Sequence, residues 1–120
     1  MAAPLVMPRT AHLVAAYVKH ALARVERDGN QGVHAGWRAE ARGSAVLDVA
    51  LGMGGYAKVT TFTSSGDTTL DSRFMTLMKQ AEPYGKLPEG LVRYRFRAKL
   101  WVDPADGLLK SEPASPLAPG

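Results

Sequence analysis

The sequence contains no cysteine among its 120 residues. This absence excludes a disulfide-stabilised scaffold, a zinc site built on thiolates and a cysteine nucleophile. No run of apolar residues approaches the roughly 18 that a membrane-spanning helix requires. Residues 1–10 hold two prolines and no cationic region ahead of an apolar stretch, which is unlike a secretory signal. We therefore expect a soluble chain that is either a complete cytosolic protein or a domain cut from a longer one.

Histidine is scarce, and its three positions are His12, His20 and His34. His12 and His20 would lie two helical turns apart, which is too far for both to bind one metal ion directly. No carboxylate pair has the spacing of a general acid and base, no serine lies in a G-x-S-x-G turn, and no glycine cluster matches a phosphate-binding loop. We therefore expect a protein that is not an enzyme and that has no metal site and no cofactor.

The remaining composition is typical of one small globular domain. Apolar residues make up 46% of the chain and charged residues 22%, which is too apolar for a disordered protein. The net charge is +4, which permits an anionic partner without requiring one.

Hydrophobic periodicity predicts a helix over residues 10–27, with Thr10 as its N-cap. Its predicted end is at residues 28–30, where Gly29 is expected to adopt the left-handed conformation. Residues 29–43 are predicted to form an ordered loop with Trp37 as its only large anchor. Flexible segments are expected at both ends, as a leader over 1–9 and a proline-rich tail over 104–120, so that the folded domain covers 10–103.

Two strands are predicted over residues 44–51 and 56–63, joined by a glycine-rich hairpin turn. A second helix is predicted to begin after Asp67 as its N-cap and to stop at Pro83. The last predicted strand covers 91–102. The order helix, strand, strand, helix, strand predicts a two-layer α+β domain, in which two helices cover one face of a three-stranded antiparallel sheet.

The last predicted strand has the most regular alternation in the chain. Its apolar face consists of Val92, Tyr94, Phe96, Ala98, Leu100 and Val102, and its cationic face of Arg93, Arg95, Arg97 and Lys99. Because sheet platforms for nucleic acid place aromatic and cationic side chains on the same face, aromatic residues on the apolar face disfavour that function. A solvated outer face is the simpler interpretation, and we expect this strand at an edge of the sheet.

The stretch from Gly43 to Val102 resembles the C-terminal domain of TonB and the related TolA proteins. The hairpin is followed by S-S-G-D-x-x-L-D, which comprises Ser64, Ser65, Gly66, Asp67, Leu70 and Asp71. An amphipathic helix ending in A-x-P, the sequence L-P-E-G-L and an alternating last strand follow. Thr68 stands where a proline is common in that family, the aromatic-proline pair usual after the first helix is absent, and the chain as given contains neither the family's membrane anchor nor its proline-rich spacer.

The resemblance implies a periplasmic, non-enzymatic module that couples inner-membrane energy to transport. Such a domain grips an extended segment of an outer-membrane transporter, or of another envelope protein, by adding it as a β-strand. In this sequence the implied binding edge is Arg93, Tyr94, Arg95, Phe96, Arg97, Ala98, Lys99, Leu100 and Trp101. An inner-membrane motor complex is an implied partner if the full-length protein has an anchor, and without one the location would be cytoplasmic.

Three alternatives remain open at this level. The domain could be a structural subunit of an envelope-spanning secretion or conjugation complex. The net charge and the R-Y-R-F-R-A-K sequence suggest instead a protein that binds nucleic acid or another anionic surface. Self-association through a free strand edge, giving a homodimer, is a further option.

Overall fold

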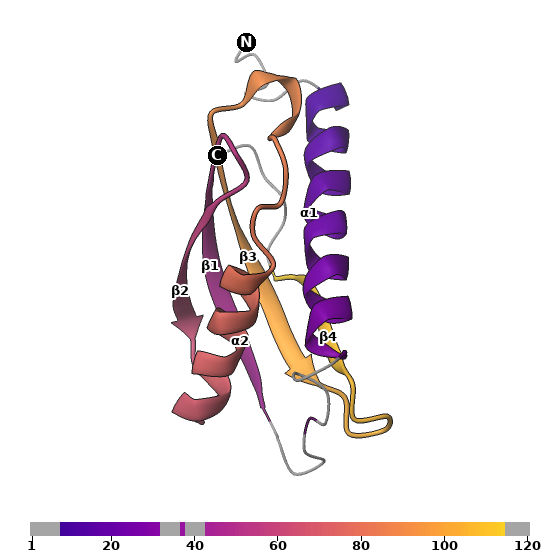
Figure 1. Cartoon of the computed structure of the whole chain (residues 1–120), viewed down its shortest axis with the longest axis vertical. Coiled ribbons are helices and arrows are strands. Elements are labelled where there is room, and N and C mark those ends of the chain that lie inside the picture. The colour runs from indigo at the N-terminus through magenta and orange to yellow at the C-terminus, as the bar shows by residue number, and fades with distance from the viewer. Residues whose placement is uncertain (1–7, 32–36, 38–42, 115–120) are drawn as a thin grey trace.

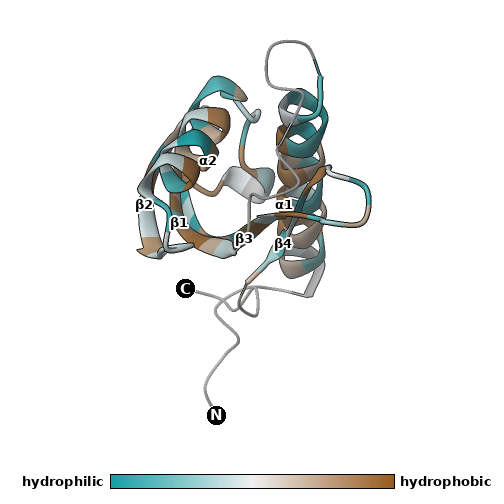
Figure 2. Cartoon of the chain, turned by 90° about the horizontal axis from the view of Figure 1, so that it is seen from below, coloured by the Kyte–Doolittle hydropathy of each residue, from teal (hydrophilic) through white to brown (hydrophobic). Residues whose placement is uncertain are grey.

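The computed structural model describes residues 8–31, 37 and 43–114. It contains a four-stranded antiparallel sheet with the strand order β2-β1-β3-β4. The elements are α1 (Pro8–Gly29), β1 (Ser44–Gly52), β2 (Ala57–Thr63), α2 (Thr68–Gln80), the short 3-10 helix η2 (Pro88–Gly90), β3 (Arg93–Val102) and β4 (Leu109–Pro113). Both α-helices lie on one face of the sheet, α2 towards β2 and α1 towards β4 (Figures 1 and 2). The predicted α+β class is confirmed, whereas the prediction of three strands is wrong.

The first helix is longer than the sequence pattern predicts. It begins at Pro8, because proline fits the first turn of a helix, and not after Thr10 as an N-cap. Gly29 is its last helical residue, so the expected left-handed stop at Gly29 is also wrong. A Cβ atom on Gly29 would lie 2.5 Å from Cδ2 of Leu109 and 3.1 Å from Cδ1 of Leu77. Glycine is therefore placed where α1 packs closely against β4 and α2.

The β1–β2 hairpin confirms the predicted glycine turn. The Gly52 N–H donates to the Tyr56 carbonyl (2.9 Å), and the Gly55 N–H donates to the Gly52 carbonyl (3.0 Å). Gly55 has a φ of 83°, which side chains other than glycine rarely adopt. The Tyr84 N–H donates to the Gly55 carbonyl (2.9 Å), so the hairpin tip is tied to the loop that follows α2.

The second helix follows its prediction closely. The Asp67 side chain accepts hydrogen bonds from the backbone N–H groups of Thr69 (2.9 Å) and Leu70 (3.2 Å), as an N-cap does. Its apolar stripe is buried, and it consists of Leu70, Phe74, Leu77, Met78 and Ala81. These side chains join the odd-numbered residues of β1 and the apolar stripe of α1 in one core.

The predicted flexible tail is wrong for the part that the structure describes. Residues 103–108 form a turn in which the Asp103 N–H donates to the Leu108 carbonyl (2.9 Å) and the Gly107 N–H to the Asp103 carbonyl (2.7 Å). The chain then returns as β4 beside β3, and Leu109 is fully buried. Of the predicted leader, Pro8 and Arg9 belong to α1, and residues 1–7 and 115–120 lie outside the described part.

Trp37 is buried, as its predicted role as an anchor requires. Its Nε1–H donates to the Gly29 carbonyl (2.7 Å), and its ring lies 5.7 Å from that of Phe74. The Arg73 guanidinium covers the ring at 3.7 Å. Trp37 therefore ties the loop to the C-terminal end of α1, and residues 32–36 and 38–42 of that predicted loop lie outside the described part.

Candidate peptide-binding site

The predicted edge strand lies inside the sheet. β3 pairs with β1 along nearly its whole length, from Arg93 opposite Gly52 to Trp101 opposite Ser44. On its other side it pairs with β4 from Ala98 to Val102. The expectation that the whole segment from Arg93 to Trp101 forms an exposed edge is therefore wrong.

The first half of β3 is open on its β4 side. Backbone N–H and C=O groups point to alternate sides along a strand. In β3, those of even-numbered residues point to β1 and those of odd-numbered residues point to β4. The last bond on the β4 side runs from the Ala114 N–H to the Arg97 carbonyl (2.9 Å). Within the described residues, the backbone N–H and C=O groups of Arg93 and Arg95 on this side have no partner.

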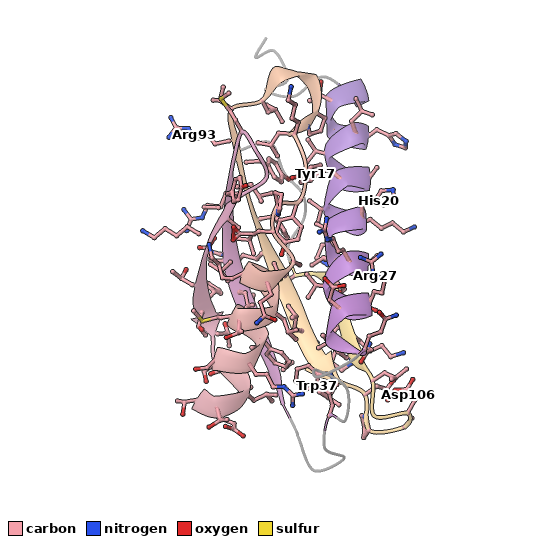
Figure 3. All side chains as sticks on the ribbon, viewed as in Figure 1. Tyr17, His20, Arg27, Trp37, Arg93 and Asp106 are labelled. Carbon is pink, nitrogen blue, oxygen red and sulfur yellow. The ribbon has the colours of Figure 1, made fainter. Side chains whose placement is uncertain are left out.

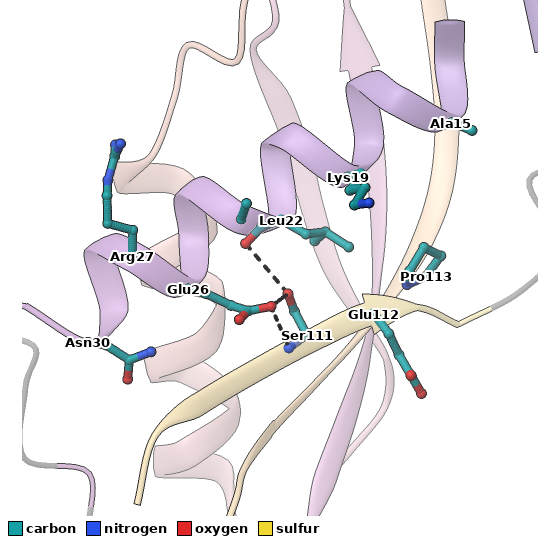
Figure 4. Close-up of a pocket in the computed structure, with 10 residues that line it drawn as sticks. Ala15, Lys19, Leu22, Glu26, Arg27, Asn30, Ser111, Glu112 and Pro113 are labelled. Carbon is teal, nitrogen blue, oxygen red and sulfur yellow. Dashed lines mark hydrogen bonds between the residues drawn. The ribbon is translucent and has the colours of Figure 1, made fainter. Parts of the chain in front are cut away.

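The outer edge of β4 is sealed by side chains at the C-terminal end of α1 and just after it. The Glu26 carboxylate accepts hydrogen bonds from the Ser111 N–H (3.0 Å) and from the Ser111 hydroxyl (2.6 Å). The Asn30 side chain accepts from the Leu109 N–H (2.8 Å) and donates to the Leu109 carbonyl (3.1 Å). Pro113 has no N–H. Figure 4 shows Glu26, Asn30, Ser111 and Pro113 along the groove between α1 and β4. The groove has a volume of about 740 Å³, and a visiting strand would find few free backbone groups there.

One arginine of β3 is held across the outer face of the sheet. Arg95 Nε donates to Asp48 Oδ1 (2.8 Å), and a second guanidinium nitrogen donates to Oδ2. Asp48 is buried among the strands. The hydrogen bonds from Arg95 lower the pKa of Asp48 below its ordinary value, because with the nearby charges they outweigh the opposing effect of burial. This pair fixes the Arg95 side chain and leaves its backbone groups at the open side.

The cationic face of the sheet also carries aromatic side chains, which corrects a prediction. Trp101 lies on the same face of β3 as Arg97 and Lys99, because alternate residues of a strand share a face. The Lys99 ammonium lies 5.4 Å from the Trp101 ring centroid. The Arg97 guanidinium lies 3.6 Å from the ring centroid of Phe62 on β2, and Phe62 is 54% exposed. The expectation that the aromatics all lie on the buried face is therefore wrong, although Phe96 is buried as predicted.

The S-S-G-D-x-x-L-D sequence has a structural role in this fold. The Asp71 carboxylate is buried and accepts hydrogen bonds from the Ser65 N–H (2.9 Å), the Ser65 hydroxyl (2.6 Å) and the Ser64 hydroxyl. Burial by itself would raise the pKa of Asp71, but these hydrogen bonds outweigh it and lower the pKa. The motif therefore fixes the turn between β2 and α2, and it does not line the open segment of β3.

Two of the three histidines lie on α1, and one of them, His20, is labelled in Figure 3. His12 and His20 are exposed on α1, as surface histidines are, and His34 lies outside the described part of the chain. No cluster of three metal-ligating side chains occurs among residues 8–31, 37 and 43–114. None of the helices within these ranges is both long and apolar enough to span a membrane.

Comparison of the chain with protein-family models, curated proteins and solved structures found no significant match.

Proposed function

We propose that this domain is a non-enzymatic module that binds an extended peptide by β-strand addition to the open half of β3. The observation that carries the proposal is the pair of residues Arg93 and Arg95, whose backbone groups face away from β1 without a partner among the described residues. An added strand would form main-chain hydrogen bonds there, each contributing about 0.5–1.5 kcal/mol. Side chains of the peptide would then select the register.

The resemblance to TonB and TolA domains supports a particular setting for this activity. In that setting the partner is an extended segment of an outer-membrane transporter or of another envelope protein, and the domain lies in the periplasm. A longer protein containing an anchor would connect it to an inner-membrane motor complex and couple energy to transport. The binding site differs from the one implied by the resemblance, because β4 already occupies the second half of β3.

Paired substitutions at Arg95 test the proposal. Arg95→Gln and Arg95→Pro both remove the guanidinium that binds Asp48, but only proline also removes the outward-facing N–H. Neither change removes a hydrogen bond to β1, because the β1 ladder uses the even-numbered residues of β3. Proline at this exposed side is therefore compatible with the sheet.

The measurement is the affinity for peptides selected from a displayed random library, followed by NMR mapping on the full chain. Arg95→Gln is expected to weaken binding only modestly, and Arg95→Pro to abolish it. The amide signals of Arg93 and Arg95 should shift most when the peptide is added. Binding that survives Arg95→Pro but is lost in Arg95→Gln would show side-chain recognition and contradict strand addition.

A second candidate function is the binding of single-stranded nucleic acid on the outer face of the sheet. It is favoured by the aromatic side chains of Phe62 and Trp101 beside the cations of β3. Bases stack on such rings while cations contact phosphates. If Lys58, Arg93, Arg97 and Lys99 each contact a phosphate, the affinity for a labelled oligothymidine should fall with a log–log salt slope of roughly −3. A flat salt titration would exclude this candidate.

A further inference from the structure

The outer edge of β2 carries backbone groups that the chain itself does not use. The Gly52 N–H donates to the Tyr56 carbonyl, and backbone groups point to alternate sides along a strand. The backbone groups of Lys58 and Thr60 therefore bond to β1. Those of Val59 and Thr61 point outward, away from the sheet. The Ala57 carbonyl, also outward, accepts from Lys79 Nζ (2.5 Å). In the described part of the chain, nothing pairs with the outward N–H and C=O groups of Val59 and Thr61.

These free groups are self-complementary. If two copies of β2 lie antiparallel with Thr60 on the two-fold axis, Val59 of each copy falls opposite Thr61 of the other. All four free groups of each copy are then satisfied, because the two residues of such a pair exchange both N–H···O=C bonds. The edge offers no further regular pairing beyond Thr61, since the β1–β2 register shifts between Val46 and Leu47.

The side chains on the outer face also fit this register. Thr60 would face Thr60 of the second copy, and cross-strand threonine pairs are favourable. Lys58 would face Phe62 of the second copy, and both side chains are exposed. No two residues directly opposite each other in this register carry like charges, and an ammonium near an aromatic ring is attractive. The Phe62 ring that Lys58 would meet also contacts the Arg97 guanidinium of its own chain.

The flank of α2 that borders β2 is centred at the level of Thr60, the residue on the proposed two-fold axis. Met75 Sδ lies 3.2 Å from the Thr61 hydroxyl, and Lys79 reaches Ala57, so Thr60 lies near the level of Met75 and Thr76. An open hollow of about 440 Å³ runs along this flank. Its lining consists of Ser72, Met75, Thr76, Lys79 and Gln80. A two-fold axis through Thr60 would bring the two flanks side by side and place Lys79 near Ser72 of the other copy.

We propose that two copies of this chain pair through their β2 edges and form one continuous eight-stranded antiparallel sheet. The second copy is the occupant that the observations favour, since its backbone groups, its side chains and its helix flank all match the same axis. The opposite end of the sheet is unsuited to such pairing, because Glu26, Asn30 and Pro113 seal β4. The dimer would leave Arg93 and Arg95 of each copy open.

Cysteine substitution tests the proposed axis, because the natural chain has no cysteine. Thr60→Cys would place two sulfurs across a non-hydrogen-bonded pair, whose Cα atoms are about 4.5 Å apart and within disulfide reach. Ala50→Cys is the matched control, since Ala50 is exposed and lies opposite Lys58 on β1, one strand inward. With oxidised glutathione, Thr60→Cys should form covalent dimer at least about tenfold faster than Ala50→Cys.

Light scattering and sedimentation of the cysteine-free full chain give the second measurement. We expect about twice the monomer mass of 12.9 kDa at high protein concentration, with the β2 amides of Val59 and Thr61 protected from exchange. Thr61→Pro, which removes an outward N–H and no bond to β1, should yield monomers, whereas Thr61→Val should not.

Equal cross-linking of Thr60→Cys and Ala50→Cys would overturn the proposal. So would a natural chain that remains monomeric at high concentration, or a monomer that binds an unrelated extended peptide at β2. The cross-linking comparison does not depend on the folding of Thr61→Pro. Because peptide binding is measured at Arg93 and Arg95, either proposal can fail while the other holds.

Discussion

Glu26 near the end of α1 binds Ser111 on β4, and its carboxylate accepts hydrogen bonds from both the backbone N–H and the hydroxyl of that residue. We predict that Glu26→Ala lowers the free energy of unfolding by about 1–2 kcal/mol, because it leaves donors of a partly buried residue without an acceptor. Hydrogen exchange at the Ser111 amide should accelerate. Arg27→Ala is the control, since among the residues that the structure describes Arg27 bonds only to Asp28. Unchanged exchange at Ser111 in Glu26→Ala would contradict the sealing role.

We predict that the folded protein loses stability in acid as the Asp71 carboxylate becomes protonated. Its pKa is lower in the folded protein than the ordinary value of 3.8, so ionised Asp71 stabilises the fold above that value, and the stabilisation is lost as the pH falls through the folded pKa. We predict that Asp71→Asn lowers the free energy of unfolding by about 1–3 kcal/mol at pH 7. The difference from the natural chain should shrink below about pH 4. Urea titrations at several pH values measure this, and a constant difference would refute it.

Two glycines with positive φ should differ in their tolerance of alanine. A Cβ atom on Gly55 would lie 2.4 Å from the Gly85 carbonyl oxygen, whereas one on Gly66 would meet nothing within 4 Å. We predict that Gly66→Ala costs about 1 kcal/mol, from backbone strain alone. Gly55→Ala should cost at least about 2 kcal/mol, because the contact with Gly85 also has to open. Equal melting temperatures for the two variants would contradict this.

The two tryptophans should respond differently to the same substitution. Trp37→Phe removes a buried donor and leaves the Gly29 carbonyl without its 2.7 Å hydrogen bond, so we predict a loss of about 1–2 kcal/mol in the free energy of unfolding. Trp101 is only half-buried, and Trp101→Phe should change stability by less than about 0.5 kcal/mol. Thermal denaturation followed by circular dichroism measures both variants. A larger loss of stability in Trp101→Phe than in Trp37→Phe would contradict this prediction.

Most of the sheet and helices was predictable because the local pattern and the packing agree. The strand predicted over residues 44–51 matches β1, where alternate residues such as Leu47 and Val49 are buried. Asp67 is the N-cap of α2, as predicted. The end of α1 is not predictable from local sequence, because glycine at position 29 is required by contact with Leu109. Leu109 lies 80 residues further along the chain, and no local pattern records such a contact.

The fourth strand is hard to predict because its five residues, LKSEP, have little apolar alternation and lie in a proline-rich stretch. Its stability depends on bonds from Glu26 and Asn30, which are remote in sequence. A usable signal was present, since Asp103–Gly107 carries proline, aspartate and glycine as turn sequences do. Recognising that turn would have moved β3 from the edge to the interior and halved the candidate binding segment.

The bonds between α1 and β4 have a consequence for the order of events during translation. Glu26 and Ser111 are 85 residues apart, so α1 leaves the ribosome long before the strand that docks on it exists. Closing so long a loop carries a high entropic cost and slows folding. The nascent domain can therefore complete its assembly only after β4 (Leu109–Pro113) has been synthesised.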